Sequence, residues 1–183
     1  MDEPKHIIFL AGFMGSGKST VGPELAKKLR YDFVDIDDMI EEREKTSVSE
    51  IFERRGEPHF RALEREMLAK ISRTERKVVV ALGGGTLGNA GNRNLVKRDG
   101  VLVYLRANRN QILSRVQRKR DRPLLLGPGG EVLSDKDLSE RVETLLRERE
   151  RHYLEASVIV DTTNLEVPET VDEILTRLQG KIE

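Results

Sequence analysis

The fold is decided by Gly12-Phe13-Met14-Gly15-Ser16-Gly17-Lys18-Ser19-Thr20, a stretch that matches the P-loop pattern G-x-x-x-x-G-K-[ST]. An apolar run at residues 7–11 precedes it and predicts a buried strand. After it, Val21, Leu25 and Leu29 recur at helical spacing, which predicts a helix. A strand, a glycine-rich loop and a helix in this order are the context in which the pattern binds phosphate. The sequence therefore predicts that the chain binds a nucleoside triphosphate.

Each part of this loop has an expected contact with the nucleotide. The glycines let backbone N–H groups turn inward around phosphate oxygens, and the start of the helix adds partial positive charge. We expect Lys18 to reach the β- and γ-phosphates and the Ser19 hydroxyl to bind Mg²⁺. A glycine turn without a ligand is the alternative, and the flanking strand and helix argue against it. The residues predicted to bind the nucleotide here are Gly12, Met14, Gly15, Ser16, Gly17, Lys18, Ser19 and Thr20.

Length and composition limit the class of protein. The chain has 183 residues, enough for one α/β domain, with 32 Lys and Arg, 32 Asp and Glu, and no cysteine. Because the charges balance, we expect neither nucleic acid nor an anionic membrane as a partner. The absence of cysteine excludes disulfides, thiolate zinc sites and cysteine nucleophiles, and it fits a reducing compartment. No apolar run approaches about 18 residues and the N-terminus lacks an apolar leader, so we expect a cytoplasmic protein.

The rest of the chain alternates between strand and helix patterns. Four more strands are predicted, three by apolar runs at residues 77–82, 101–105 and 158–161, and one at residues 31–37 by the strand-forming Phe33, Val34 and Ile36. Five strands separated by helices call for a parallel sheet that is covered on both faces, which is an α/β fold. Residues 37–71 are the exception, because two or three helices follow one another there without a strand, and Arg55-Gly56-Glu57-Pro58 interrupts the helical pattern. An amphipathic helix predicted at residues 170–178 closes the chain. We therefore predict a single domain over residues 1–183 with a helical insert at about 37–64.

Two aspartates lie at the predicted C-terminal end of the second strand, at the edge where ligands bind in open parallel sheets. Asp35 could hold Mg²⁺ through water, or it could be an ordinary solvated carboxylate. Asp37 could accept a proton from a substrate hydroxyl or orient it. Capping the next helix explains Asp37 equally well from residue type alone. Both alternatives stay open at this point.

Two further motifs also admit a structural explanation. Arg61 and Glu64 lie three residues apart, so they share one helical face, where such a pair is more often an exposed ion pair than a binding site. Gly83-Gly84-Gly85 follows the strand predicted at 77–82. Three glycines there permit the backbone to approach a ligand closely, but a tight turn explains them equally well.

A basic segment lies in the second half of the chain. Five of the eight residues from Arg115 to Arg122 are basic, namely Arg115, Arg118, Lys119, Arg120 and Arg122. No aromatic residue is interleaved with them, which argues against a nucleic-acid site. Pro and Gly keep the segment at about 118–130 irregular, and we predict that it forms a mobile lid. Arg122 in such a lid would neutralise charge on a transferring phosphoryl group.

Taken together, these motifs resemble shikimate kinase almost from end to end. The similar segments are the P-loop, Asp35-x-Asp37, Gly56-Glu57-x-x-Phe60-Arg61-x-x-Glu64, Gly83-Gly84-Gly85, Arg122-Pro123-Leu124-Leu125 and Arg149-x-x-x-Tyr153. The resemblance implies a three-layer P-loop kinase fold of the nucleoside-monophosphate-kinase type. It also implies transfer of the ATP γ-phosphoryl to the 3-hydroxyl of shikimate, with Mg²⁺, in the chorismate route to aromatic amino acids. We expect a monomer.

The resemblance also implies a role for individual residues. Lys18, Asp37 and Arg122 would be catalytic, and Ser19 and Asp35 would bind the metal. Arg115 would lie near the adenine of ATP. The residues that would bind shikimate are Asp37, Arg61, Glu64, Gly83, Gly84, Gly85, Arg122 and Arg149.

One segment departs from the family, and two other functions stay open. Residues 161–166 lack the arginine pair that some members place near adenine. Another small-metabolite kinase, such as a gluconate kinase, shares the P-loop, but we would not expect it to combine the motif at 56–64 with Arg149. An ATP-binding module without transfer, with the basic segment holding RNA, is the third hypothesis.

Overall fold

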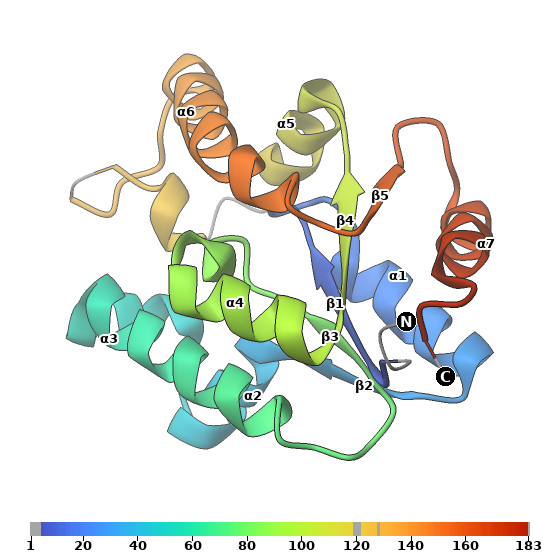
Figure 1. Ribbon diagram of the computed structural model, residues 1–183. Helices are drawn as coiled ribbons and strands as arrows, with labels where there is room; N and C mark the ends of the chain where they lie inside the picture. Colours follow the sequence, from blue (N-terminus) through green and yellow to red (C-terminus); the bar gives the residue numbers. More distant parts are fainter. Residues whose placement is uncertain (1–4, 119–121, 128, 183) are drawn as a thin grey trace.

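A parallel sheet of five strands runs through the middle of the computed structural model, which describes residues 5–118, 122–127 and 129–182 (Figure 1). The strand order is β2-β3-β1-β4-β5. The strands are β1 (Ile7–Ala11), β2 (Asp32–Asp35), β3 (Val78–Ala81), β4 (Val101–Arg106) and β5 (Val158–Asp161). All five predicted strands are present, and the predicted α/β class is confirmed.

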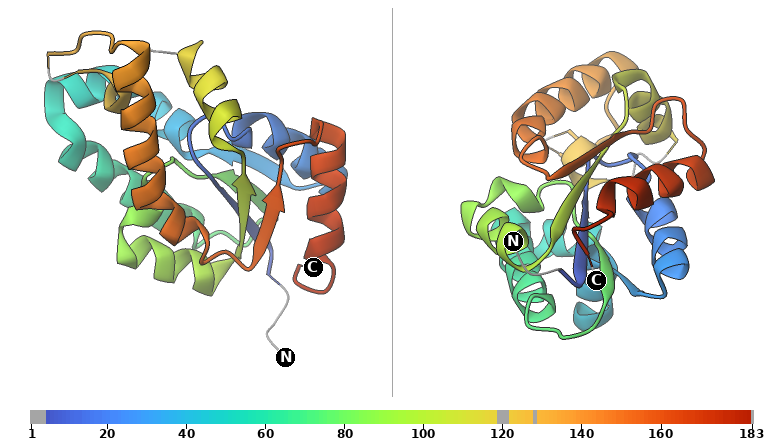
Figure 2. Two further views of the ribbon diagram at one scale, coloured as in Figure 1. Left: turned by 90° about the horizontal axis from the view of Figure 1, so that it is seen from above. Right: turned by 45° about the vertical axis from the view of Figure 1, so that its right-hand side comes forward.

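Helices cover both faces of the sheet, as parallel strands require. They are α1 (Lys18–Leu29), α2 (Ile36–Glu44), α3 (Val48–Ile71), α4 (Ala90–Asp99), α5 (Arg109–Gln117), α6 (Asp135–Tyr153) and α7 (Val167–Leu178), with short 3₁₀ turns η1 (Thr86–Gly88) and η2 (Pro123–Leu125). Helices α1 and α7 lie side by side on one face, as Figure 2 shows, and α2 to α6 pack on the other. The two hydrophobic cores therefore flank one sheet.

Strand β1 shows how the sequence divides between these cores. Ile7 and Phe9 point into the core beneath α2 to α6, whereas Ile8 and Leu10 point into the core beneath α1 and α7. This alternation is the two-residue period of a strand. All five residues of β1 are buried, which explains why the run is apolar throughout.

The strand order places the ends of several strands at one edge. Strand β1 lies between β3 and β4. Strands β2 and β3 lie on one side of it and strands β4 and β5 on the other, so the strand order reverses direction at β1. In open parallel sheets this switch point is where ligands bind. The P-loop after β1, Asp35 at the end of β2 and the glycines after β3 therefore meet at the same edge.

The helical insert is built from α2 and a kinked α3. Ser47 caps α3 by accepting a hydrogen bond from the Glu50 N–H at 3.2 Å. Gly56 interrupts the helix with a φ of 80° and a ψ of 166°, where the sequence predicted a break. Two helices, one of them in two parts, thus lie between β2 and β3.

Two boundaries differ from the sequence prediction. Strand β2 ends at Asp35, so Asp37 lies in the first turn of α2 and not at the end of the strand. Helix α7 begins at Val167 rather than at Thr170, because Glu166 and Glu169 form a reciprocal capping box that adds a turn. In the segment predicted as a lid, residues 119–121 and 128, among them Lys119 and Arg120, lie outside the described residues.

In the part of the chain that the structure describes, no helix is both long and apolar enough to cross a membrane.

Candidate active site

A cleft of about 740 Å³ opens at the edge of the sheet where the strands end. Its lining includes the P-loop, both aspartates, the glycine triplet and arginines from α3, α5, α6 and the segment before η2. Every residue predicted to bind or react lines this cleft, with the exception of Gly12. Gly12 lies behind the loop, since a Cβ there would come within 2.7 Å of the Leu105 carbonyl oxygen.

The P-loop has the backbone that its glycines predict. Gly12, Gly15 and Gly17 have φ angles of 150°, 80° and 102°, a region that other residues avoid. Helix α1 begins directly after Gly17, and no side chain caps it. Its first N–H groups therefore face the cleft without a side-chain acceptor, as a phosphate site requires.

Lys18 lies over this loop. Its Nζ donates to the carbonyl oxygens of Gly12 and Phe13, at 2.8 and 3.2 Å. Burial lowers the pKa of Lys18 to about 8, although the charges of Asp37 and Asp35 oppose the shift. A partly buried ammonium held by neutral carbonyls gains from an anionic partner, and a nucleotide phosphate is such a partner.

Asp35 serves two elements at once. Its Oδ1 accepts a hydrogen bond from the Asp37 N–H at 2.9 Å and so caps α2, while its Oδ2 accepts from the Ser19 hydroxyl at 3.0 Å. The pair offers two oxygen donors of the kind that Mg²⁺ prefers. Among the described residues, no group of three His, Cys, Asp or Glu side chains could hold a metal by itself. The pair fits Mg²⁺, which usually keeps several waters and shares its shell with phosphates.

Asp37 does not cap the helix, because Asp35 performs that function. Burial raises the pKa of Asp37 to about 6, helped by Asp35 and Glu64 and opposed by Arg122 and Lys18. Its Oδ1 is buried and has no hydrogen-bond partner among the residues that the structure describes. Buried polar atoms are normally paired, so this oxygen is an acceptor that suits a ligand hydroxyl.

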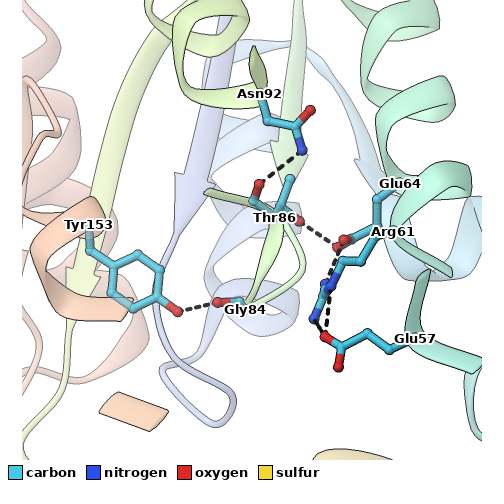
Figure 3. A network of polar contacts seen from close by, with 7 residues as sticks. All are labelled: Glu57, Arg61, Glu64, Gly84, Thr86, Asn92 and Tyr153. Carbon is cyan, nitrogen blue, oxygen red and sulfur yellow. Dashed lines mark hydrogen bonds and ion pairs between the residues drawn. The ribbon is translucent and has the colours of Figure 1, made fainter. Parts of the chain in front are cut away.

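Arg61 and Glu64 are not an exposed surface pair, because the Glu64 side chain has no exposed surface. Arg61 Nη1 donates to Glu64 Oε2 at 2.5 Å, and the Thr86 hydroxyl donates to Glu64 Oε1 at 2.6 Å. Asn92 of α4 donates to the Thr86 carbonyl oxygen at 2.9 Å, so a chain of hydrogen bonds joins α4 to Arg61 (Figure 3). No sequence motif pointed to Thr86 or Asn92, since Glu64, the carboxylate that they support, lies on a different helix.

The glycine triplet separates Arg61 from Arg149. A Cβ on Gly85 would lie 2.4 Å from Arg61 Nη2, and a Cβ on Gly84 would lie 3.2 Å from Arg149 Nη1. The Tyr153 hydroxyl donates to the Gly84 carbonyl oxygen, which ties the triplet to the end of α6 (Figure 3). The glycines thus admit two guanidinium groups at close range.

The other end of the cleft is formed by α5 and the segment after β5. Arg115 donates to the Gly15 carbonyl oxygen at 2.7 Å, and Gln111 donates to the Thr163 carbonyl oxygen. The segment after β5 contributes residues that sequence reasoning did not assign, namely Thr162, Leu165, Val167 and Thr170. Residues 161–166 contain no arginine, so no residue type marked this segment.

The fold and the site together define a P-loop kinase: a phosphate-binding loop at the switch point of a parallel sheet, with acidic groups and arginines opposite it. A family model described as shikimate kinase matches residues 14–179. The chain belongs to the shikimate kinase family, whose members are ATP-dependent phosphotransferases, and the resemblance found in the sequence is confirmed.

Relatives and solved structures agree with this assignment. A shikimate kinase from Chloroherpeton thalassium is 44% identical over 176 residues, covering 96% of this chain and 94% of that protein. The structure of a shikimate kinase from Acinetobacter baumannii in complex with shikimate has a TM-score of 0.86 and 32% identity, covering 97% of this chain and 95% of that one. A gluconokinase from Sinorhizobium meliloti has a TM-score of 0.59 at 20% identity, covering 98% and 94%, so it shares the fold alone.

Proposed function

We propose that this chain transfers the γ-phosphoryl of ATP to the 3-hydroxyl of shikimate, giving shikimate 3-phosphate and ADP. The proposal rests above all on the unpaired Oδ1 of Asp37, which lies in a cleft that Arg61 and Arg149 also line. A small anionic polyol needs a carboxylate for its hydroxyls and guanidinium groups for its own carboxylate. The chemistry of this site and the membership of the family point to the same acceptor.

The substrate is held from several elements. Arg61 and Arg149 bind its carboxylate, with Glu64 keeping Arg61 in place and the backbone of residues 83–85 approaching the ring. Asp37 accepts the hydrogen bond of the reacting hydroxyl. A rigid arrangement of this kind contributes to rate because the hydroxyl is oriented before phosphoryl transfer begins.

Charge stabilisation comes from the nucleotide side of the cleft. The transition state of phosphoryl transfer is loose and spreads negative charge over the equatorial oxygens. Lys18 and Arg122 supply positive charge there, and both are close enough to lower the pKa of Asp37 electrostatically. We propose that Ser19 and Asp35 hold Mg²⁺, which neutralises phosphate charge when it is bound.

The close packing of Gly85 gives a first test. Gly85→Ala would place a Cβ 2.4 Å from Arg61 Nη2 and so push the guanidinium away from the substrate carboxylate. We expect the KM for shikimate to rise about tenfold, while the KM for ATP changes little. Gly88→Ala is the matched control, because a Cβ there has no atom within 4 Å. Steady-state kinetics of both variants would check this, and an unchanged shikimate KM in Gly85→Ala would contradict the role of Arg61.

The metal site gives a second test. Asp35→Asn removes a negative charge next to Ser19 but keeps an oxygen that can cap α2. We expect the Mg²⁺ concentration for half-maximal rate to rise about tenfold, because hard cations prefer charged oxygen ligands. The measurement is a Mg²⁺ titration at a fixed ATP concentration. An identical titration curve in the variant would remove Asp35 from the metal site.

The product itself tests the proposed reaction. Phosphorus NMR of a reaction run to completion is expected to show one phosphomonoester coupled to the proton at carbon 3 of shikimate. Coupling to another ring proton would place the transferred group elsewhere.

We further propose that the chain forms one domain with a substrate-binding insert at about 37–64 and a lid at about 118–130. We propose that it acts as a cytoplasmic monomer without nucleic-acid or membrane partners.

A further inference from the structure

Arg61 is already paired with two carboxylates of its own helix. Its Nη1 donates to Glu64 at 2.5 Å, while its Nε and Nη2 both donate to Glu57 Oε1, at 3.1 and 2.8 Å. Figure 3 shows the guanidinium between these two side chains. The Nε–Nη2 edge is one from which an arginine gives a carboxylate two parallel hydrogen bonds, and Glu57 occupies it.

The surroundings of the guanidinium restrict any other approach. Gly85 packs against it, since a Cβ at Gly85 would lie 2.7 Å from Arg61 Cζ, and the ring of Phe60 has its centroid 5.4 Å from the same atom. A guanidinium donates its hydrogen bonds in its own plane, so a carboxylate ligand has to arrive along an edge. An arriving carboxylate therefore meets a group whose edges already hold two carboxylates.

These two carboxylates differ in how readily they exchange. The side chain of Glu64 is 0% exposed and also accepts the Thr86 hydroxyl, so releasing Arg61 would leave a buried charge unpaired. The side chain of Glu57 is 47% exposed, and on release its charge passes into water. Exposed pairs of this kind contribute little free energy. Glu57 is the partner that can leave.

The position of Glu57 in the helix favours such a release. It directly follows Gly56, where α3 is broken, and so lies in the first turn of the second half of the helix. A carboxylate in the first turn is stabilised by the partial positive charge of the helix N-terminus. Glu57 therefore keeps a favourable electrostatic environment after it has left Arg61.

We propose that Glu57 competes with the carboxylate of the substrate for Arg61 and thereby sets how tightly the substrate is bound. Glu57 occupies the Nε–Nη2 edge of Arg61 until a substrate carboxylate replaces it. The alternative, three carboxylates around one guanidinium, is opposed by their mutual repulsion. This inference rests on the proposed function, since it takes the carboxylate of shikimate as the competitor.

The test is Glu57→Gln, which keeps the size of the side chain and removes its charge. The dissociation constant for shikimate, measured by titration calorimetry, is expected to fall about two- to fivefold, the range that an exposed ion pair accounts for. The methyl ester of shikimate has no carboxylate charge, so its much weaker binding should be the same in both proteins. The KM for ATP should stay within about twofold of the wild-type value.

Glu66→Gln is the matched control. Glu66 lies on the same helix and pairs with an arginine, Arg43, at 2.7 Å, with its side chain 59% exposed. This variant should bind shikimate as the wild type does. An unchanged or larger dissociation constant in Glu57→Gln would overturn the proposal and make Glu57 a support of Arg61. A wild-type protein that does not bind shikimate at all would instead refute the proposed function.

Discussion

Asp37→Asn is expected to lower kcat by about 10²–10⁴-fold at saturating ATP and shikimate, the usual range for loss of a general base. Asparagine keeps the size of the side chain and its oxygen, but it cannot take up the proton of the substrate hydroxyl. Asp32→Asn is the matched control, because Asp32 is exposed at the start of β2 and its contact with Arg76 is 3.9 Å long. Near wild-type turnover in Asp37→Asn would rule out proton transfer and leave only an orienting role.

The pH dependence follows from the raised pKa of Asp37. Because the pKa is about 6, Asp37 is mostly ionised at neutral pH and protonated below about pH 6. We therefore expect kcat/KM to be constant above about pH 7 and to fall as the pH drops through 6. In Asp37→Asn this decline should be absent.

The same substitution should stabilise the protein. The pKa of Asp37 is about 6 in the folded chain against an ordinary value of 3.8, so the folded state binds the proton more tightly than the unfolded state. Protonation of Asp37 therefore stabilises the folded state. This stabilisation is fully present below about pH 4 and is lost as the pH rises through about 6. At pH 7 the ionised Asp37 therefore destabilises the fold, and Asn should raise Tm. A lower Tm would show that the charge of Asp37 stabilises the fold instead.

Arg61→Met is expected to have the second large effect, on binding and on stability together. Removal of one guanidinium from the substrate carboxylate should raise the KM for shikimate by about 10²-fold, in line with a charge-assisted bond of about 1.5–3 kcal/mol. The variant also leaves Glu64 as a buried carboxylate without its cation. Breaking such a pair costs about 3–5 kcal/mol of unfolding free energy.

A double variant separates these two effects. Arg61→Met with Glu64→Gln removes both charges. The glutamine keeps a side-chain oxygen that can accept the hydrogen bond of the Thr86 hydroxyl. Denaturant unfolding should show that much of the lost stability returns, because the buried charge is gone. The KM for shikimate should stay high. Recovery of the KM in the double variant would mean that Arg61 acts only by balancing Glu64.

Local sequence patterns predicted the elements of this fold well. The P-loop, the five strands and the break at Gly56 are visible as spacing and residue type within short windows. The role of Asp37 was undecided from the sequence, because capping and catalysis favour the same residue type. Only the structure shows that Asp35 caps α2, which leaves Asp37 unpaired at Oδ1.

Contacts between distant segments were beyond the reach of the sequence. The Thr86 hydroxyl holds Glu64 and the Asn92 side chain holds the Thr86 carbonyl oxygen, and neither residue belongs to a sequence pattern that indicates such a contact. The second carboxylate on Arg61 was overlooked for another reason. From the sequence, Arg61 was paired with Glu64 alone, although the spacing of four residues between Glu57 and Arg61 also predicts an ion pair on one helical face.

The most direct measurement is release of ADP in a coupled assay with MgATP, comparing shikimate, gluconate and no added acceptor. A shikimate kinase releases ADP rapidly with shikimate and only at the background rate with gluconate or without an acceptor. Equal ADP release in all three reactions would mean that the cleft does not select this acceptor. Tight ATP binding without turnover on shikimate would contradict the proposed transfer altogether.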